Sequence, residues 1–158
     1  MDGAYRLDGR SAVVISAANG IGRACAIAFA AAGARVIAAD LDEANAEATA
    51  ELIRAEGGAA VAHRVDARSP EDLDALVARA REAHGGLDVL LYGAAMHDQS
   101  GTVLEITPEH WDEVLRVNLT GAFLACRAAL PAMIEGGGGS IVLIASQLGS
   151  VAAPARAG

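Results

Sequence analysis

The sequence predicts an α/β fold in which a doubly wound parallel sheet, with the strand order 3-2-1-4-5, lies between two layers of helices. Short continuous apolar runs alternate with segments of helical period along the chain, and such alternation is typical of right-handed βαβ units with parallel strands. The apolar content is 53%, while aromatic residues make up only 3%. Small aliphatic side chains suit helices that pack closely on a sheet. We expect one domain over residues 1–158.

The expected strands are short, mostly apolar segments, and the first of them is a continuous apolar run, as expected for a strand that is covered on both faces. They are residues 12–15, 35–39, 59–65, 87–91 and 140–145. Helical periods fill the intervals, with Asp42 and Ser69 placed to cap the second and third helices. Thr107 precedes a long helix that we expect to run through Leu130 and to break or kink near Pro131.

Charge and composition exclude several classes of function. The net charge is −8, and all 12 basic residues are arginines, so there is no basic stripe for nucleic acid and no lysine for a lysine-dependent mechanism. The two cysteines fit no metal-ligand spacing. We expect no signal peptide in the first ten residues and no membrane span, since the uncharged, alanine-rich stretch 24–34 is too short to cross a bilayer. The expected location is the cytoplasm.

A glycine-rich turn follows the first expected strand and opens the first expected helix. Free backbone N–H groups and the helix dipole favour an anion at such a turn, and small residues let a pyrophosphate approach the backbone. By itself the motif is a weak signal, because many helices begin after a glycine. The candidate phosphate-binding residues are Ser16, Asn19, Gly20, Ile21 and Gly22.

Asp40 strengthens the case for a dinucleotide. It ends the second expected strand, 18 residues after Gly22, where a Rossmann-type fold places the acid that binds the adenosine ribose. A carboxylate there accepts hydrogen bonds from the ribose hydroxyls and repels a 2′-phosphate. The pattern of Asp40 followed by Leu41, without a flanking basic residue, therefore predicts NAD in preference to NADP. The alternative is that Asp40 is only a surface acid or a helix cap.

Several segments together resemble the classical short-chain dehydrogenase/reductase family. They are residues 20–24, Asp40, 65–66, 87–90, 117–123, 139–142 and Ser146, in the family's order and spacing. The resemblance implies an NAD(P)-dependent oxidoreductase that transfers hydride between the nicotinamide and a small alcohol or ketone. It also implies a homo-oligomer, as a dimer or tetramer, for the full-length protein.

The resemblance assigns further cofactor contacts to the middle of the chain. Asp66, followed by Ala67, is similar to the acid that hydrogen-bonds the adenine amino group. Gly93, Ala94 and Ala95 lie where the family has the segment that lines the adenosine side.

Two catalytic residues are also implied by the resemblance. Asn118 is similar to the asparagine that kinks its helix and holds a water in the proton relay, and Ser146 to the serine that hydrogen-bonds the substrate carbonyl. An asparagine inside an apolar helix lowers helix stability unless it has such a role. Residues 96–100 border the expected substrate pocket, but a solvated loop is the simpler interpretation of His97.

The sequence departs from the family pattern in three places. Ile15 and Ser16 replace the opening Thr-Gly, and a positive φ at Ser16 would cost ~1–2 kcal/mol. Tyr92, with residues 93–95, replaces Asn-Asn-Ala-Gly, so we expect the side-chain hydrogen bonds of that segment to be lost. The family's catalytic tyrosine lies thirteen residues after the serine, which is one position beyond Gly158.

We therefore expect the sheet to be C-terminally incomplete and the 158-residue chain to lack efficient turnover. Without a tyrosine whose pKa a lysine lowers, proton transfer loses a typical ~10²–10⁴-fold of rate. One alternative is a non-catalytic dinucleotide-binding or regulatory module that pairs with a full-length homologue. A second is another Rossmann-type enzyme, such as a methyltransferase. Sugars, steroids, acyl chains and secondary alcohols all remain open as substrates.

Overall fold

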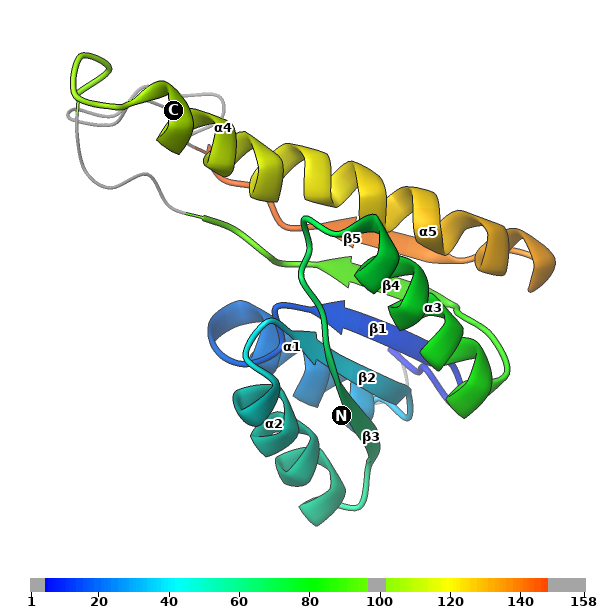
Figure 1. The fold of residues 1–158 in the computed structure, drawn as a ribbon. Coiled ribbons are helices and arrows are strands. Elements are labelled where there is room, and N and C mark those ends of the chain that lie inside the picture. Colours follow the sequence, from blue (N-terminus) through cyan, green and yellow to red (C-terminus); the bar gives the residue numbers. More distant parts are fainter. Residues whose placement is uncertain (1–4, 97–101, 148–158) are drawn as a thin grey trace.

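The computed structural model describes residues 5–96 and 102–147 as an α/β sandwich around one five-stranded sheet (Figure 1). Strands and helices alternate, as the sequence predicts. The elements are β1 (Ser11–Ile15), α1 (Gly20–Ala31), β2 (Arg35–Asp40), α2 (Glu43–Ala55), β3 (Ala59–Arg64), α3 (Pro70–His84), β4 (Val89–Tyr92), α4 (Pro108–Leu115), the π-helical segment η1 (Arg116–Gly121), α5 (Ala122–Glu135) and β5 (Ser140–Leu143).

The sheet has the predicted order β3-β2-β1-β4-β5, and every strand pair is parallel. The central strand β1 is entirely buried, with Val13 opposite Ile37 of β2 and Leu90 of β4. The polypeptide crosses from one side of β1 to the other after β3. That switch point brings the carboxyl ends of β1 and β4 together at the sheet edge where open α/β sheets bind ligands.

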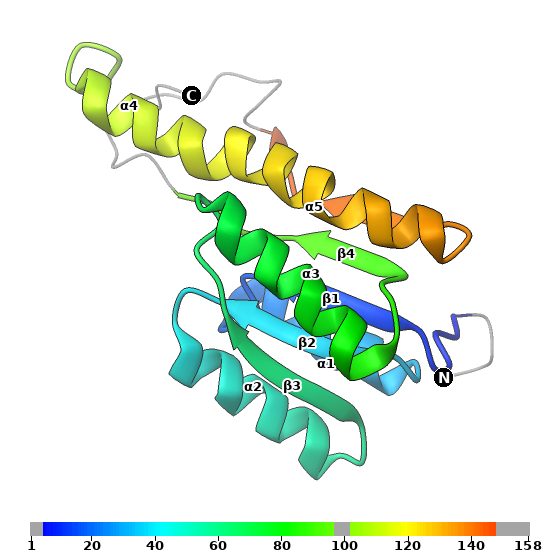
Figure 2. The same cartoon turned by 45° about the vertical axis from the view of Figure 1, so that its right-hand side comes forward.

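Helices cover both faces of the sheet and enclose two apolar cores (Figure 2). Ala26 of α1 and Ile53 of α2 pack on one face, against Val14 and Val36. On the other face α3 and α5 pack against the alternate strand residues, including Ile37. Because most of the helix residues at these contacts are alanines, the helices lie close to the sheet.

The helix ends have the chemistry that the sequence predicts. The side chain of Asp42 accepts a hydrogen bond from the backbone N–H of Asn45, and Ser69 accepts one from Asp72. Gly85 ends α3 in the left-handed region, at φ 84°. These caps satisfy backbone groups that have no partner within the helix, so local sequence determines where α2 and α3 begin and where α3 ends.

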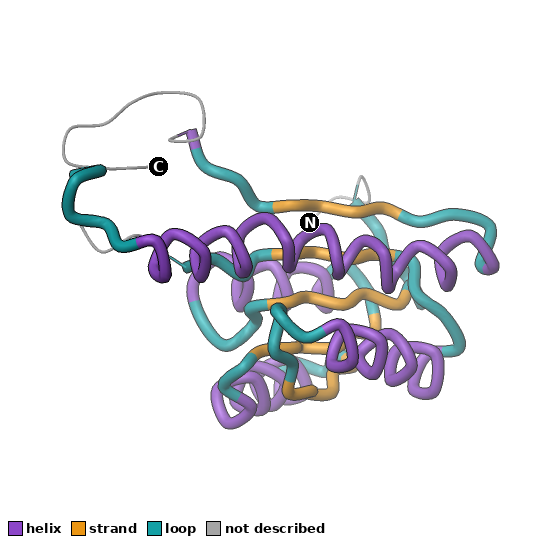
Figure 3. The backbone as a smooth tube through the Cα atoms, turned by 45° about the horizontal axis from the view of Figure 1, so that its top comes forward, coloured by secondary structure: helices purple, strands orange, loops and turns teal. Residues whose placement is uncertain are grey.

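The predicted long helix is present, but its irregularity is not at Pro131. Helix α5 continues through Pro131 to Glu135, and the run from α4 to α5 is continuous (Figure 3). The departure from α-helical geometry is the segment η1, centred on Asn118. A proline inside a helix destabilises the helix because it removes one backbone hydrogen bond and its ring clashes with a carbonyl one turn earlier. The burial of Ala132 and Met133 in the core favours continuation of the helix past Pro131.

Two strand ends differ from the expected ones by two residues. Strand β4 begins at Val89, later than the predicted residue 87, and β5 ends at Leu143 where the prediction extends to residue 145. One further backbone hydrogen bond, from Ile144 N–H to the carbonyl of Tyr92, continues the pairing past the end of β5. Apolar composition alone does not locate the last residue that pairs.

Among the described residues, one helical run is long and apolar enough to cross a membrane by length and composition alone, Pro108–Glu135, with mean hydropathy 1.4. The core helix of a globular protein passes the same test. Ala125, Ala129 and Met133 of this run are buried against α3 and β4. Of the most apolar window of this run, 28% is buried in the described structure.

Candidate functional site

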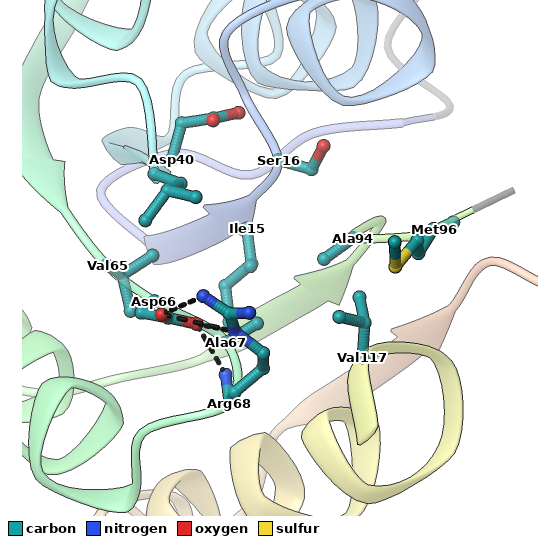
Figure 4. A pocket seen from close by; sticks show the side chains of 12 residues that line it. Ile15, Ser16, Asp40, Val65, Asp66, Ala67, Arg68, Ala94, Met96 and Val117 are labelled. Carbon is teal, nitrogen blue, oxygen red and sulfur yellow. Dashed lines mark hydrogen bonds and ion pairs between the residues drawn. The ribbon is translucent and has the colours of Figure 1, made fainter. Parts of the chain in front are cut away.

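A cavity of about 290 Å³ opens at the carboxyl edge of the sheet, beside the switch point (Figure 4). This volume lies near the lower end of the ~300–1,000 Å³ range of ligand pockets. Residues from the carboxyl ends of β1 and β2, from the loops after β1, β2, β3 and β4, and from η1 line it. They are Ile15, Ser16, Asp40, Leu41, Val65, Asp66, Ala67, Arg68, Ala94, Ala95, Met96 and Val117.

The glycine-rich turn after β1 has the backbone geometry of a close-approach site. Ser16 has a φ of 71°, and it is the one non-glycine residue with positive φ in the described part of the chain. Gly20 has φ 54°, with open space where its side chain would be. A Cβ at Gly22 would lie 1.9 Å from the carbonyl oxygen of Ser16. Both glycines are therefore required: Gly20 for its positive φ, and Gly22 for the tight packing of the turn on α1.

The N-terminus of α1 offers backbone donors to an anion. Within the described residues, Asn19 is the N-cap but makes no side-chain capping bond, and the first turn holds no acidic residue. The first N–H groups of a helix have no intrahelical partners, and the helix dipole adds positive potential there. Ile21 is 62% exposed beside them. This unblocked helix end fits a phosphate-bearing ligand.

The turn is held from behind by α2. Thr49, fully buried, donates a hydrogen bond to the carbonyl of Ala17 at 2.8 Å and accepts one from the Arg23 Nε at 3.0 Å. This support was not predicted from the sequence. A threonine at the buried position of a polar helix is its only signal in the sequence.

Asp40 ends β2 with its carboxylate directed at the turn. Its Oδ2 accepts a hydrogen bond from the Ala18 N–H at 2.9 Å, and its Oδ1 accepts one from Asp42 N–H at 3.0 Å. Each oxygen keeps a second lone pair, so the carboxylate still has acceptor capacity toward the cavity. Leu41, 53% exposed, follows at the rim.

Asp66 and Arg68 form an ion pair at the floor of the cavity, drawn with dashed lines in Figure 4. The Arg68 side-chain hydrogen bonds to the Asp66 carboxylate outweigh burial and lower the pKa of Asp66 to about 2. Arg68 also reaches Glu113 of α4 at 3.3 Å. Asp66 is therefore a permanently charged acceptor at neutral pH, but it shares its carboxylate with Arg68.

The segment after β4 keeps its links to the neighbouring elements, which corrects our expectation that the hydrogen bonds of the segment are lost. The Gly93 N–H donates to the Ile15 carbonyl at 3.0 Å, and a Cβ at Gly93 would lie 3.2 Å from that oxygen. The Tyr92 hydroxyl donates to the carbonyl of Val117 at 2.5 Å. Backbone groups and a phenol thus replace the family's amide side chains. Ala94 and Ala95 line the cavity.

Asn118 lies in η1 and is hydrogen-bonded to the loop after β4. Its Oδ1 accepts from the Met96 N–H at 2.7 Å, and its Nδ2 donates to the Met96 carbonyl at 3.0 Å. This pair of bonds holds the asparagine beside the cavity, which Met96 and Val117 line. Ser146 follows the end of β5 and is exposed, and it is not among the residues that line the cavity.

The cavity brings together seven of the residues that the sequence predicts for the cofactor site: Ser16, Asp40, Leu41, Asp66, Ala67, Ala94 and Ala95. Four further lining residues were not predicted from the sequence, and their only signal there is that each adjoins a predicted residue. They are Ile15, Val65, Arg68 and Val117. Met96 borders the cavity as expected of its segment, whereas His97 lies outside the described residues.

The sheet order, the glycine-rich turn and the cavity at the switch point define a Rossmann-type α/β protein. A family model described as short chain dehydrogenase matches residues 10–158. The chain belongs to this family of oxidoreductases.

Relatives of known name support the assignment. The chain is 38% identical over 148 residues to D-threitol dehydrogenase of Mycolicibacterium smegmatis, covering 94% of this chain and 56% of that protein. It is 40% identical over 145 residues to sorbitol dehydrogenase of Cereibacter sphaeroides, covering 91% and 55%. The crystal structure of gox2181 superposes with a TM-score of 0.92 at 36% identity, covering 95% of this chain and 58% of that one. The chain thus spans about half the length of the curated relatives it matches.

Proposed function

We propose that the protein is an NAD-dependent oxidoreductase that transfers hydride between the nicotinamide and a small alcohol or ketone. The observation that carries the proposal is the cavity at the switch point, which is lined by Asp40 and by Ser16 of the turn that leads to the uncapped N-terminus of α1. Residues 19–22 of that turn and helix end are not among the lining residues. An unblocked helix end supplies donors for a pyrophosphate, and a carboxylate at the end of β2 supplies acceptors for ribose hydroxyls.

The proposed cofactor is NAD rather than NADP. The Asp40 carboxylate is fixed by backbone N–H groups of Ala18 and Asp42 and lies at the cavity beside Leu41. A 2′-phosphate at that position would meet a negative charge, and the cation of the cavity wall, Arg68, is already paired with Asp66. In this proposal Asp66 and Ala67 contact the adenine, with Gly93, Ala94 and Ala95 beside the adenosine.

A sugar alcohol or related polyol is the substrate class we propose to test first, because the named relatives include dehydrogenases of D-threitol and sorbitol. When bound, the nicotinamide supplies the hydride acceptor. Of the chain's own residues, Asn118 would orient a water of the proton relay and Ser146 would hydrogen-bond the substrate oxygen. Both roles rest on the family pattern. We also propose a homo-oligomer in the cytoplasm.

The alternative is a non-catalytic dinucleotide-binding module that pairs with a longer homologue. Strand β5 favours it: within the described residues it is one of the two edge strands, and Leu143 at its end and the next residue, Ile144, are 49% and 40% exposed. Exposed apolar edge strands are sites of pairing with other chains.

The test is oxidation of D-threitol, sorbitol and a simple secondary alcohol by the protein isolated from its natural source, with NAD⁺ and NADP⁺ in parallel, followed by the absorbance of the reduced nicotinamide. The intact mass is recorded on the same sample. Turnover with NAD⁺ and at least one alcohol supports the proposal. Cofactor binding without turnover of any alcohol, together with co-purification of a longer homologue, would support the alternative instead.

A further inference from the structure

We propose that Tyr92 is a positioning residue for Asn118: from the end of β4 its phenol holds the π-helical segment η1 that carries the asparagine. The importance of this for hydride transfer rests on the proposed function. The contact itself does not, because it lies between residues of this chain.

The first observation is a hydrogen bond across 25 residues of sequence. The Tyr92 hydroxyl donates to the backbone carbonyl of Val117 at 2.5 Å. Tyr92 is only 2% exposed and packs in the core between the sheet and the helices α3 and α5. The phenol therefore has little freedom to move, and the carbonyl that it holds belongs to the residue before Asn118.

The second observation is the absence of a side chain at Gly121, the last residue of η1. A Cβ there would lie 2.3 Å from the Tyr92 hydroxyl oxygen and 2.8 Å from the carbonyl oxygen of Ala67. Both distances are far inside van der Waals contact. Gly121 thus leaves the space through which the phenol reaches Val117, so Tyr92 and Gly121 fit each other as a pair.

The third observation is that the chain after β4 binds η1 a second time. Asn118 accepts from the N–H of Met96 and donates to the carbonyl of the same residue, at 2.7 and 3.0 Å. Tyr92 and Met96 stand at the two ends of one short stretch of chain. That stretch binds η1 at two points: the backbone carbonyl of Val117 and the side chain of Asn118.

The hydroxyl remains a donor over the physiological pH range. Burial, with a smaller contribution from the negative charge of Asp66, raises the pKa of Tyr92 to about 12. The hydrogen bond to Val117 is therefore independent of pH wherever the protein would work. This constancy suits a residue that positions another and does not itself exchange protons.

The experiment measures amide hydrogen exchange by NMR on the ¹⁵N-labelled chain, for the wild type, Tyr92→Phe and the matched control Tyr5→Phe. Tyr5 is 89% exposed. We expect Tyr92→Phe to speed exchange of the Asn118 side-chain amide and of the η1 backbone about fivefold or more, as for loss of one ordinary hydrogen bond. After correction for global stability, β1 and α1 should be unchanged, and Tyr5→Phe should change neither region.

A uniform acceleration throughout the protein would show that Tyr92 contributes only general stability and would overturn the inference. So would unchanged exchange at Asn118. A second comparison uses Gly121→Ala, alone and combined with Tyr92→Phe. If the phenol and Gly121 are matched, the alanine disturbs Asn118 exchange less when the hydroxyl is absent. Strictly additive effects would contradict the pairing.

NADH titration of the same samples separates this inference from the proposed function. If the wild type binds no NADH but Tyr92→Phe still loosens η1 selectively, the positioning contact stands and the proposed function fails. If NADH binds but η1 is unaffected by Tyr92→Phe, the positioning role of Tyr92 fails and the proposed cofactor binding stands.

Discussion

The hydroxyl of Thr49 on α2 donates a hydrogen bond to the backbone carbonyl of Ala17, 2.8 Å away in the glycine-rich turn. Both residues are fully buried. We predict that Thr49→Val, which keeps the shape but leaves that carbonyl unsatisfied, lowers the free energy of unfolding by about 1–3 kcal/mol. Thr49→Ser keeps the hydrogen bond and serves as the control. Urea denaturation measures both, and equal losses in the two variants would argue against a role for the hydroxyl.

Ser16 is strained at φ 71°. Because glycine adopts this conformation freely, we predict that Ser16→Gly raises the free energy of unfolding by up to about 1 kcal/mol. Ala17→Gly is the matched control: Ala17 is not among the described residues with positive φ, so glycine there should destabilise by at least ~0.5–1 kcal/mol. Thermal or urea unfolding compares them. A loss of stability in Ser16→Gly would mean that the serine side chain contributes more than its backbone strain costs.

Alkaline pH should destabilise the protein through Tyr92. Burial, and secondarily the charge of Asp66, raises the pKa of Tyr92 to about 12, against about 10 in the unfolded chain. The folded state binds the proton more tightly, so this stabilisation is complete below about pH 10 and is lost as the pH rises toward 12. The chain contains no lysine to titrate in that window. Urea denaturation across it should show a steeper decline in the wild type than in Tyr92→Phe, and parallel curves would refute the assignment.

Asp66 should also stabilise the folded state, but this stabilisation is lost at acid pH. Hydrogen bonds from Arg68 hold its pKa at about 2, against about 3.9 in the unfolded chain. The stabilisation is present above pH ~4 and is lost as the pH falls through about 2. We predict that Arg68→Gln raises the pKa of Asp66 in carboxyl NMR titrations. Arg79→Gln, which removes a surface pair with Glu82, is the control. An unchanged pKa in Arg68→Gln would show that the ion pair does not control Asp66.

The strand order and the helix N-caps were predictable because they depend on local patterns: apolar runs, and Asp42 and Ser69 before helices. A kink at Asn118 was implied only by the family resemblance, and its π-helical geometry was not predicted. Helix continuation through Pro131 was missed, since the gain from burying Ala132 and Met133 is a tertiary effect.

Within the candidate site, Asp40 was predictable from its spacing after the glycine-rich turn, and Asp66 was implied by the family resemblance; both line the cavity. The contacts that hold the site together were not predictable. Thr49 meets Ala17 across 32 residues and Tyr92 meets Val117 across 25. No local period encodes such pairs, because they depend on how separate elements pack.

The central claim is that the cavity beside Asp40 binds a dinucleotide without a 2′-phosphate, and a titration of the chain with NADH and NADPH tests it most directly. Calorimetry should show tighter binding of NADH by at least about tenfold, because a single hydrogen bond to a charged group contributes ~1.5–3 kcal/mol. Asp40→Ala should abolish most of that preference, while Asp74→Ala, at an exposed position on α3, should leave it unchanged. Absence of saturable NADH binding, or a preference that survives in Asp40→Ala, would contradict the account.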